Sequence, residues 1–310
     1  MIIAPNANRL YNELMWALKT QGVEENSRGG RVLTITHPVV FCLLDSRKNI
    51  LFAPRRRPNP VFHVMEFIWM MAGEDRVDWL LQFNKNMGNF AEDDGRIHGA
   101  YGARWKNQLI LLVSVLMKDP TTRQAVLAMW EPEQDLTTAP LKDRPCNTHI
   151  YFRKANHALN MTVCNRSNDL VWGALGSNIV HFPLLLEWIA HATGIAPGIY
   201  RVMTNNLHLY YDLYDGLALM DEALTLPNVR HSGRTHPLLF SDESPWKFIL
   251  ECQNFIQGRR TTLSWFQAVA GPMKDWWETR DEHTLTSIKD TGWQNACRAW
   301  AIQGTSKSNG

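Results

Sequence analysis

Apolar side chains recur along the chain with the periods of helices and strands. Leu10, Leu14 and Leu18 fall every four residues and give one apolar face, as in an amphipathic helix. The stretch that ends at Gly73 is apolar almost all round, which predicts a helix buried on every side, and Pro183 predicts a helix start or a kink. The pattern predicts helices in residues 8–20, 61–72, 109–117 and 179–193.

Alternation and β-branched residues predict the strands. Leu159, Met161 and Val163 alternate with more polar residues, as in a strand with one buried face. Strands are predicted in residues 31–44, 124–130, 148–152, 159–164 and 199–203. From Pro245 onward the pattern is helical and rich in Trp. Because strands and helices mix without strict alternation, the predicted fold class is α+β with a mixed sheet.

Composition narrows the class of protein. The 310 residues are 45% hydrophobic and 20% charged, as in a soluble globular protein, and 32 Lys and Arg against 30 Asp and Glu give no basic footprint for a nucleic-acid partner. No run reaches the ~18 apolar residues of a membrane span, and no secretory signal is apparent. Five cysteines without a Cys-x-x-Cys pair predict neither a metal site nor a disulfide framework, and a cytoplasmic setting is expected.

Cys146 is a candidate nucleophile. Most lone cysteines are small core side chains, but Cys146 follows Pro145 at the edge of a predicted strand and lies two residues from Arg144. A nearby guanidinium stabilises the thiolate over the thiol, which is what a nucleophile requires.

Three further groups of polar residues could form a site. Arg166 and Ser167, at a strand end, could clamp a phosphate or form a solvated turn. Glu66 lies mid-helix among apolar residues, where burial would raise its pKa and suit acid–base work, unless it lies on an exposed stripe. In an extended stretch His208 and Tyr210 point the same way, either toward a sugar hydroxyl or as a core pair.

Five motifs, in order, resemble the thymidylate synthase family and its pyrimidine nucleotide hydroxymethylases. Residues 166–173 followed by Ser177-Asn178-Ile179 are similar to the family's Arg-Ser-x-Asp-x-x-x-Gly-x-x-x-Asn-Ile, with one extra residue before the Asn. The other four motifs are Pro145-Cys146, Met65-Glu66-Phe67-Ile68-Trp69, Tyr101-Gly102-x-x-Trp105 and His208-Leu209-Tyr210. The resemblance runs from about residue 22 to residue 215. It implies a three-layer α+β catalytic domain in residues 1–234; we expect a helical, Trp-rich extension in 235–303 and a disordered tail in 304–310.

The resemblance also implies a role for each matched residue. Cys146 would add to C6 of the pyrimidine, Glu66 would relay protons with waters, and Tyr101 would assist removal of the C5 proton. Asn178 would contact the base edge, and Asp169 would hold the pterin of 5,10-methylenetetrahydrofolate. His208 and Tyr210 would bind the 3′-hydroxyl of the sugar. Arg166 and Ser167 would hold the phosphate, with Arg28 as a shifted candidate for the same task. Arg123 would reach the phosphate of the other subunit in a homodimer.

Departures from the family pattern fall on the reductive half of the synthase reaction. The residue after the nucleophile is Asn147 rather than His, the second of two paired arginines is Gln124, and Met87 aligns near the Trp that packs on the one-carbon adduct. The family's short apolar C-terminal peptide is replaced by the Trp-rich extension. Without a sealed site, water can attack the adduct in place of hydride.

These departures predict a hydroxymethylase that uses dUMP and a folate co-substrate, in the host cytoplasm if the chain is viral. The amide of Asn178 can accept from N3–H and donate to O4 of uracil, a pattern that cytosine cannot match. The alternatives are an ordinary thymidylate synthase, a dCMP hydroxymethylase, and a non-catalytic nucleotide- or folate-binding module. A pure binding module would need neither Cys146, Glu66 nor Tyr101.

Overall fold

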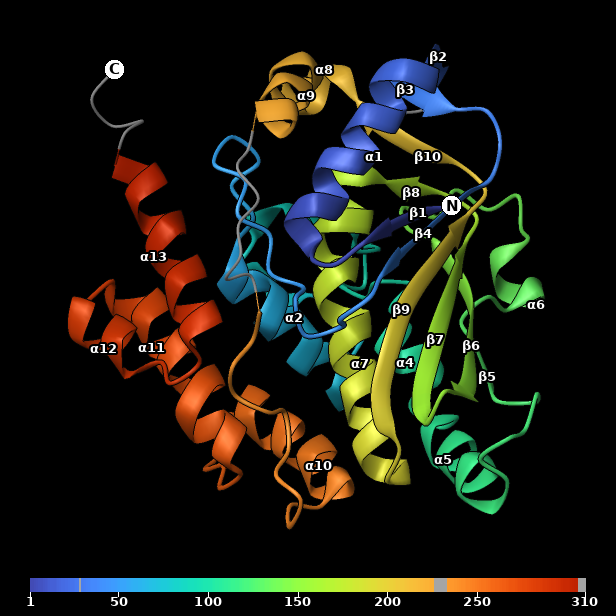
Figure 1. Cartoon of the computed structure of the whole chain (residues 1–310). Helices are drawn as coiled ribbons and strands as arrows, with labels where there is room; N and C mark the ends of the chain where they lie inside the picture. Colours follow the sequence, from blue (N-terminus) through green and yellow to red (C-terminus); the bar gives the residue numbers. More distant parts are fainter. Residues whose placement is uncertain (28, 226–232, 306–310) are drawn as a thin grey trace.

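A six-stranded mixed sheet forms the centre of the protein (Figure 1). The computed structural model describes residues 1–27, 29–225 and 233–305. In spatial order the strands are β1 (Ile2–Ala4), β4 (Val39–Leu43), β9 (Ala196–Thr204), β7 (Ala158–Asn165), β6 (Asn147–Ala155) and β5 (Val126–Ala128). Strand β7 pairs parallel to β9 and antiparallel to β6. The predicted α+β class with a large mixed sheet is confirmed.

A second, four-stranded sheet lies beside the first. Its order is β2 (Val23–Ser27), β3 (Gly30–Ile35), β10 (Leu207–Tyr210) and β8 (Asn168–Asp169). The short strand β8 runs parallel to β10 and sets Asp169 opposite His208. Two candidate residues that are far apart in sequence thus become neighbours through backbone pairing.

Helices α1 (Ala7–Gln21), α2 (Pro60–Ala72) and α7 (Asn178–Thr193) cover one side of the large sheet (Figure 1). Helix α7 begins at Asn178, so Pro183 lies inside it. A proline has no N–H to donate to the carbonyl four residues earlier, and Asn49 Nδ2 donates to that carbonyl of Ile179 instead, at 3.1 Å. The apolar stretch Leu170–Thr193 is long enough to cross a membrane, but 83% of its window is buried in the fold, as in a core helix.

Shorter helices connect these layers. They are α3 (Asp78–Leu81), the 3₁₀ helix η1 (Lys85–Phe90), α4 (Tyr101–Trp105), α5 (Leu109–Lys118), α6 (Pro132–Asp135), the π-helix η2 (Leu170–Ser177), α8 (Tyr211–Tyr214) and α9 (Gly216–Thr225). Helix α5 was predicted, whereas η2 was not.

The C-terminal part is helical, as its pattern predicted. It contains α10 (Pro245–Ile256), the π-helix η3 (Phe266–Ala270), α11 (Gly271–Thr279), α12 (Glu282–Ser287) and α13 (Thr291–Thr305). Trp265, Trp276 and Trp293 are at most 2% exposed, so they supply much of the core of this part. Helix α13 includes the first two residues of the predicted 304–310 tail, and residues 306–310 lie outside the described part of the chain.

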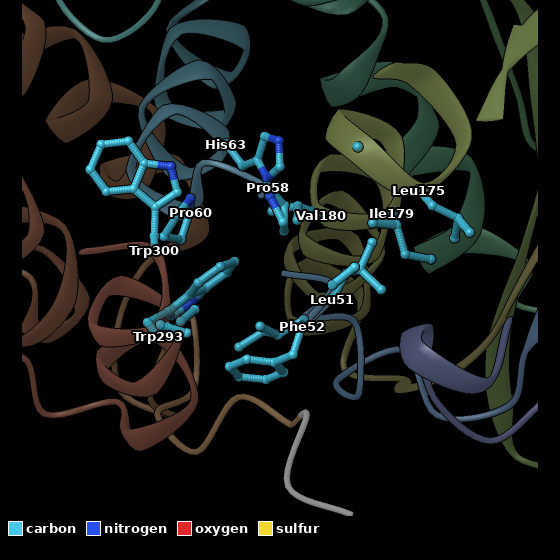
Figure 2. Close-up of a pocket in the computed structure, with 15 residues that line it drawn as sticks. Leu51, Phe52, Pro58, Pro60, His63, Leu175, Ile179, Val180, Trp293 and Trp300 are labelled. Atoms are coloured by element: carbon cyan, nitrogen blue, oxygen red, sulfur yellow. The ribbon is translucent and has the colours of Figure 1, made fainter. Parts of the chain in front are cut away.

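The seam between α13 and α2 is closed by aromatic and cationic side chains. Arg57 lies 4.5 Å and Arg280 4.9 Å from the centroid of the Trp300 ring, and both contacts are cation–π interactions. Figure 2 shows Trp293 and Trp300 facing a small cavity that Pro58 and His63 also line. Its volume is about 20 Å³, close to that of a single water molecule, so the seam is a packing interface.

Candidate active site

The β6–β7 hairpin brings Cys146 and Arg166 together. Because the two strands are antiparallel and consecutive, the residue before β6 and the residue after β7 meet at the same end of the sheet. The backbone N–H of Arg166 donates to the carbonyl of Cys146 at 3.0 Å.

The guanidinium of Arg166 holds the loop that carries Cys146. Its Nε donates to the Pro145 carbonyl at 2.9 Å, and its Nη2 lies 3.8 Å from Cys146 Sγ. A cation at this place favours the thiolate. Arg144, which the sequence suggested for that task, donates instead to the backbone carbonyls of Asp135, Thr137 and Ala139. These three hydrogen bonds direct its guanidinium along the loop.

Two joined cavities surround Cys146, an outer cleft of about 830 Å³ and an inner pocket of about 180 Å³. The outer cleft is lined, among others, by Cys146, Arg166, Ser167, Asp169, His208 and Tyr210. The inner pocket is lined, among others, by Glu66, Tyr101, Cys146, Ser167, Asp169 and Asn178. Arg123 is exposed and lines neither cavity, and Arg28 lies outside the described residues.

Glu66, on α2, faces the inner pocket with 13% of its side chain exposed. Ser177 Oγ donates to Glu66 Oε2 at 2.8 Å, and His181 Nε2 lies 3.4 Å from the same oxygen. Burial raises the pKa of Glu66 to about 8, against the opposing effect of the Ser177 hydrogen bond. The carboxyl group therefore keeps its proton at neutral pH and can act first as an acid.

His181 is a neighbour of Glu66 that the sequence reasoning missed. Burial lowers the pKa of His181 to about 3, so the ring is neutral. Its Nε2 lies 3.0 Å from the carbonyl oxygen of His63, and since a carbonyl only accepts, Nε2 carries the proton. The only signal in the sequence was a histidine two residues after Ile179 in an otherwise apolar helix.

Tyr101 begins α4 beside the nucleophile. Its hydroxyl accepts a hydrogen bond from the backbone N–H of Asn147 at 3.4 Å, and burial raises the pKa of Tyr101 far above its ordinary value. The phenol therefore stays protonated. A Cβ at Gly102 would lie 2.1 Å from the Met70 carbonyl oxygen, so the glycine lets α4 approach α2 closely. The side chain of Asn147 is buried and accepts a hydrogen bond from Asn165.

His208 and Tyr210 line the other end of the outer cleft. His208 Nδ1 lies 2.8 Å from Asn206 Oδ1, which leaves Nε2 as an acceptor. Burial lowers the pKa of His208, so the ring is neutral and can accept from a hydroxyl group. The two rings meet edge to face, 5.1 Å between centroids. Gly29 lines the same cleft and packs against the Tyr210 ring.

The π-helix η2 accommodates the extra residue of the longest motif. The N–H of Asn178 donates to the carbonyl of Gly173, a span of five residues, one more than the span of four in an α-helix. Arg56 Nη2 donates to the carbonyl of Val171 at 2.6 Å and fixes this turn. Asn178 is 7% exposed and lines the inner pocket from the first position of α7.

An indole lines the cleft, although the sequence has no Trp close to Met87. Trp172 of η2 borders both cavities and stacks on Phe90 with ring centroids 6.1 Å apart. Met87 is 6% exposed, while Asn86 and Asn89 of the same helix η1 line the outer cleft. The sequence contained Trp172 inside a matched motif, but only the fold shows that it faces the site.

The sequence matches one protein-family model and several phage proteins that share one name. A family model described as thymidylate synthase matches residues 9–268, which extends past residue 234 into α10 and η3. Deoxyuridylate hydroxymethyltransferase of Pseudomonas phage M6 is 36% identical over 256 residues, 78% of this chain and 73% of that protein. Proteins of the same name from Bacillus phage SP01 and Delftia phage PhiW-14 are 35% and 31% identical over 66% and 71% of this chain. The matches cover 57% and 65% of those two proteins, less than two thirds of their length.

Proposed function

The chain belongs to the thymidylate synthase family, and from this premise we propose that it is a deoxyuridylate hydroxymethylase. It would transfer a one-carbon unit from 5,10-methylenetetrahydrofolate to C5 of dUMP and hydrate it to 5-hydroxymethyl-dUMP. Three phage relatives that bear the name deoxyuridylate hydroxymethyltransferase support this reaction. Their source also supports action in the host cytoplasm.

The observation that carries the proposal is a nucleophile with its acid–base partners at a cleft that has exposed polar residues along its edge. Cys146, Glu66 and Tyr101 border one inner pocket, as the steps up to the one-carbon adduct require. Toward solvent the cleft is bordered by the exposed amides Asn86 and Asn89. Water that reaches the adduct can add to it, which is the step that separates hydroxymethylation from reductive methylation.

The nucleotide would lie along the outer cleft with its base in the inner pocket. Arg166 and Ser167 would hold the phosphate, since a guanidinium and a hydroxyl group both donate to phosphate oxygens. His208 Nε2 and the Tyr210 hydroxyl would bind the 3′-hydroxyl of the sugar. Asn178 would pair with N3–H and O4 of the uracil.

The chemistry would begin with addition of Cys146 to C6, which makes C5 nucleophilic toward the one-carbon unit. Tyr101 would assist loss of the C5 proton, and Glu66 would supply and recover protons through water. The folate co-substrate would occupy the rest of the cleft, with Asp169 toward its pterin. A volume of about 830 Å³ falls within the usual range for such sites. None of these roles calls for a metal ion.

Incubation of dUMP with methylenetetrahydrofolate tests the proposed reaction. The nucleotide product is expected to carry the added mass of a hydroxymethyl group, with tetrahydrofolate regenerated and no dihydrofolate absorbance. A methylated product with stoichiometric dihydrofolate would identify a thymidylate synthase.

A thymidylate synthase is the second candidate because an aromatic pair could shield the adduct. Trp172 and Phe90 stack beside Cys146 and could keep water away while hydride transfers from the folate. The two reactions share every group up to the adduct, and ~1.4 kcal/mol in relative barriers changes the product ratio tenfold.

A homodimer completes the proposal. On the face of the large sheet remote from α7, Val126, Tyr151 and Met203 are 37–45% exposed, which is unusual for apolar strand residues without a partner. Arg123 is exposed and lies three residues before Val126, the first residue of the edge strand β5. A second subunit on this face would receive Arg123 at its phosphate site.

Mixed dimers test this arrangement. The Arg123→Ala and Cys146→Ala variants are each expected to be nearly inactive as homodimers. Mixing them should restore activity, because one site of the mixed dimer would combine an intact Cys146 with an Arg123 from the other subunit. The matched control mixes Cys146→Ala with Arg166→Ala. One subunit supplies both of these residues to the same site, so each site of this mixed dimer carries one substitution and activity should not return. If the Arg123 mixture stays inactive, or if light scattering finds an active monomer, Arg123 is not lent.

A further inference from the structure

Asp143 is a carboxylate in the cleft to which the reaction described above gives no role. It lies three residues before Cys146 and borders both the outer cleft and the inner pocket. Cys146, Ser167, Asp169 and Trp172 are shared by the two cavities in the same way. Asp143 therefore stands at the junction where the one-carbon adduct on the base would meet solvent.

The backbone fixes the carboxylate in this place. The N–H of Gly99 donates to Asp143 Oδ2 at 3.0 Å, and the backbone N–H of Arg144 is a second donor. A Cβ at Gly99 would lie 2.4 Å from the same oxygen, so only glycine permits the contact. Because Gly99 lies two residues before Tyr101, the same stretch of chain holds the carboxylate and the phenol beside the nucleophile.

The surroundings make Asp143 a better base than an exposed aspartate. Burial raises the pKa of Asp143, and this effect outweighs the hydrogen bonds from Gly99 and Arg144 and the fields of Arg166 and His98. Tyr101 is a further titratable group on the cleft side, and after burial the charges of Cys146 and Asp143 also raise its pKa. A carboxylate with a raised pKa removes protons from water more effectively.

The other two carboxyl groups that line the described cavities are less suited to this task. Glu66 keeps its proton at neutral pH because burial raises its pKa to about 8. Asp169 Oδ1 accepts from the backbone N–H of Val171 at 2.9 Å, and its proposed role is to hold the pterin. Asp143 thus remains as the carboxylate able to accept a proton at the mouth of the inner pocket.

We propose that Asp143 is the general base that activates the water in the hydration step; this rests on the proposed function. The water oxygen bonds to the exocyclic methylene carbon, and its proton passes to the Asp143 carboxylate. The electron pair of the C5–methylene double bond moves to C5 and the C4 carbonyl. It then expels Cys146 from C6 as the thiolate and forms the C5–C6 double bond of 5-hydroxymethyl-dUMP. No electrons are gained or lost, so no reductant is needed.

Asp143→Asn is the sharpest test, because an amide oxygen can still accept from Gly99 while it cannot take a proton. With dUMP tritiated at C5, the variant is expected to release tritium in a rapid burst of one equivalent per active site, since this precedes hydration. Hydroxymethyl product should then form ~10²–10⁴-fold more slowly than in the unchanged protein, the usual contribution of a general base. The decline in rate at low pH, where the wild-type carboxylate is protonated, should disappear, and Asp143→Glu should restore part of the rate.

The matched control is Asp93→Asn, an exposed aspartate whose carboxylate pairs with Lys142 at the rim; it should leave all rates unchanged. Equal loss of tritium release and product in Asp143→Asn would show a structural role, and an unchanged product rate would show no role; either result overturns the inference. A wild-type protein that yields methylated nucleotide and dihydrofolate would instead refute the proposed function. The two failures are therefore distinct.

Discussion

Cys146→Ser is expected to lower turnover by several orders of magnitude while nucleotide binding is retained. A serine hydroxyl remains protonated at neutral pH, whereas the thiol of Cys146 lies 3.8 Å from the Arg166 guanidinium, which favours the thiolate. Serine is only slightly smaller than cysteine, so the shape of the cleft and the residues that would bind the phosphate should not change. Steady-state product formation and calorimetric binding of dUMP check the two halves of this expectation.

Cys164→Ser is the matched control. Cys164 lies in β7 at the same end of the sheet, is 9% exposed and borders neither cavity. The Cys164→Ser variant should be somewhat less stable, because it buries a hydroxyl group, but its turnover should be unchanged. Near-normal turnover of Cys146→Ser, or an equal loss in Cys164→Ser, would remove Cys146 from the role of nucleophile.

Asn178→Asp is expected to reverse the preference between dUMP and dCMP. A carboxylate has no donor for O4 of uracil, but it accepts from the exocyclic amino group of cytosine. Because Asn178 is buried, each group left unpaired costs about 1–3 kcal/mol, so competition assays should shift by one to several orders of magnitude.

Asn160→Asp provides the matched control for the change of charge. Asn160 lies on β7 away from the cavities, and its Oδ1 accepts from the backbone N–H of Ile199 at 2.8 Å, a bond that a carboxylate keeps. Its base preference should not change. If Asn178→Asp keeps the original preference, another group selects the base.

The sequence predicted the long elements of the fold because their periods are strong. Helices α1, α2, α5 and α7 and strands β6, β7 and β9 all lie where the apolar pattern placed them. It missed β1 and α9, and it missed η2, because a π-helix has no period of its own in the sequence. The internal position of Pro183 depended on Asn49, a residue distant in sequence that satisfies the carbonyl the proline leaves unpaired.

The predicted site residues are mostly brought together, because the motifs sit at strand ends and helix starts that the fold gathers at one cleft. His181, Trp172 and Asp143 could not be assigned from the sequence, since their importance lies in what they face. Glu66 shows the same limit. Its burial inside an apolar helix was one of two predicted alternatives, but its partners Ser177 and His181 come from η2 and α7, which are distant in sequence. The roles of all the site residues remain predictions; Arg123 in addition lines neither cavity, and Arg28 lies outside the described residues.

The source of the oxygen in the product distinguishes attack by water from transfer of hydride. The reaction is run with dUMP and methylenetetrahydrofolate in water enriched in heavy oxygen, and the nucleotide is analysed by mass spectrometry. We expect 5-hydroxymethyl-dUMP with one heavy oxygen in the hydroxymethyl group and no dihydrofolate. A methylated nucleotide without heavy oxygen, formed together with dihydrofolate, would contradict this expectation.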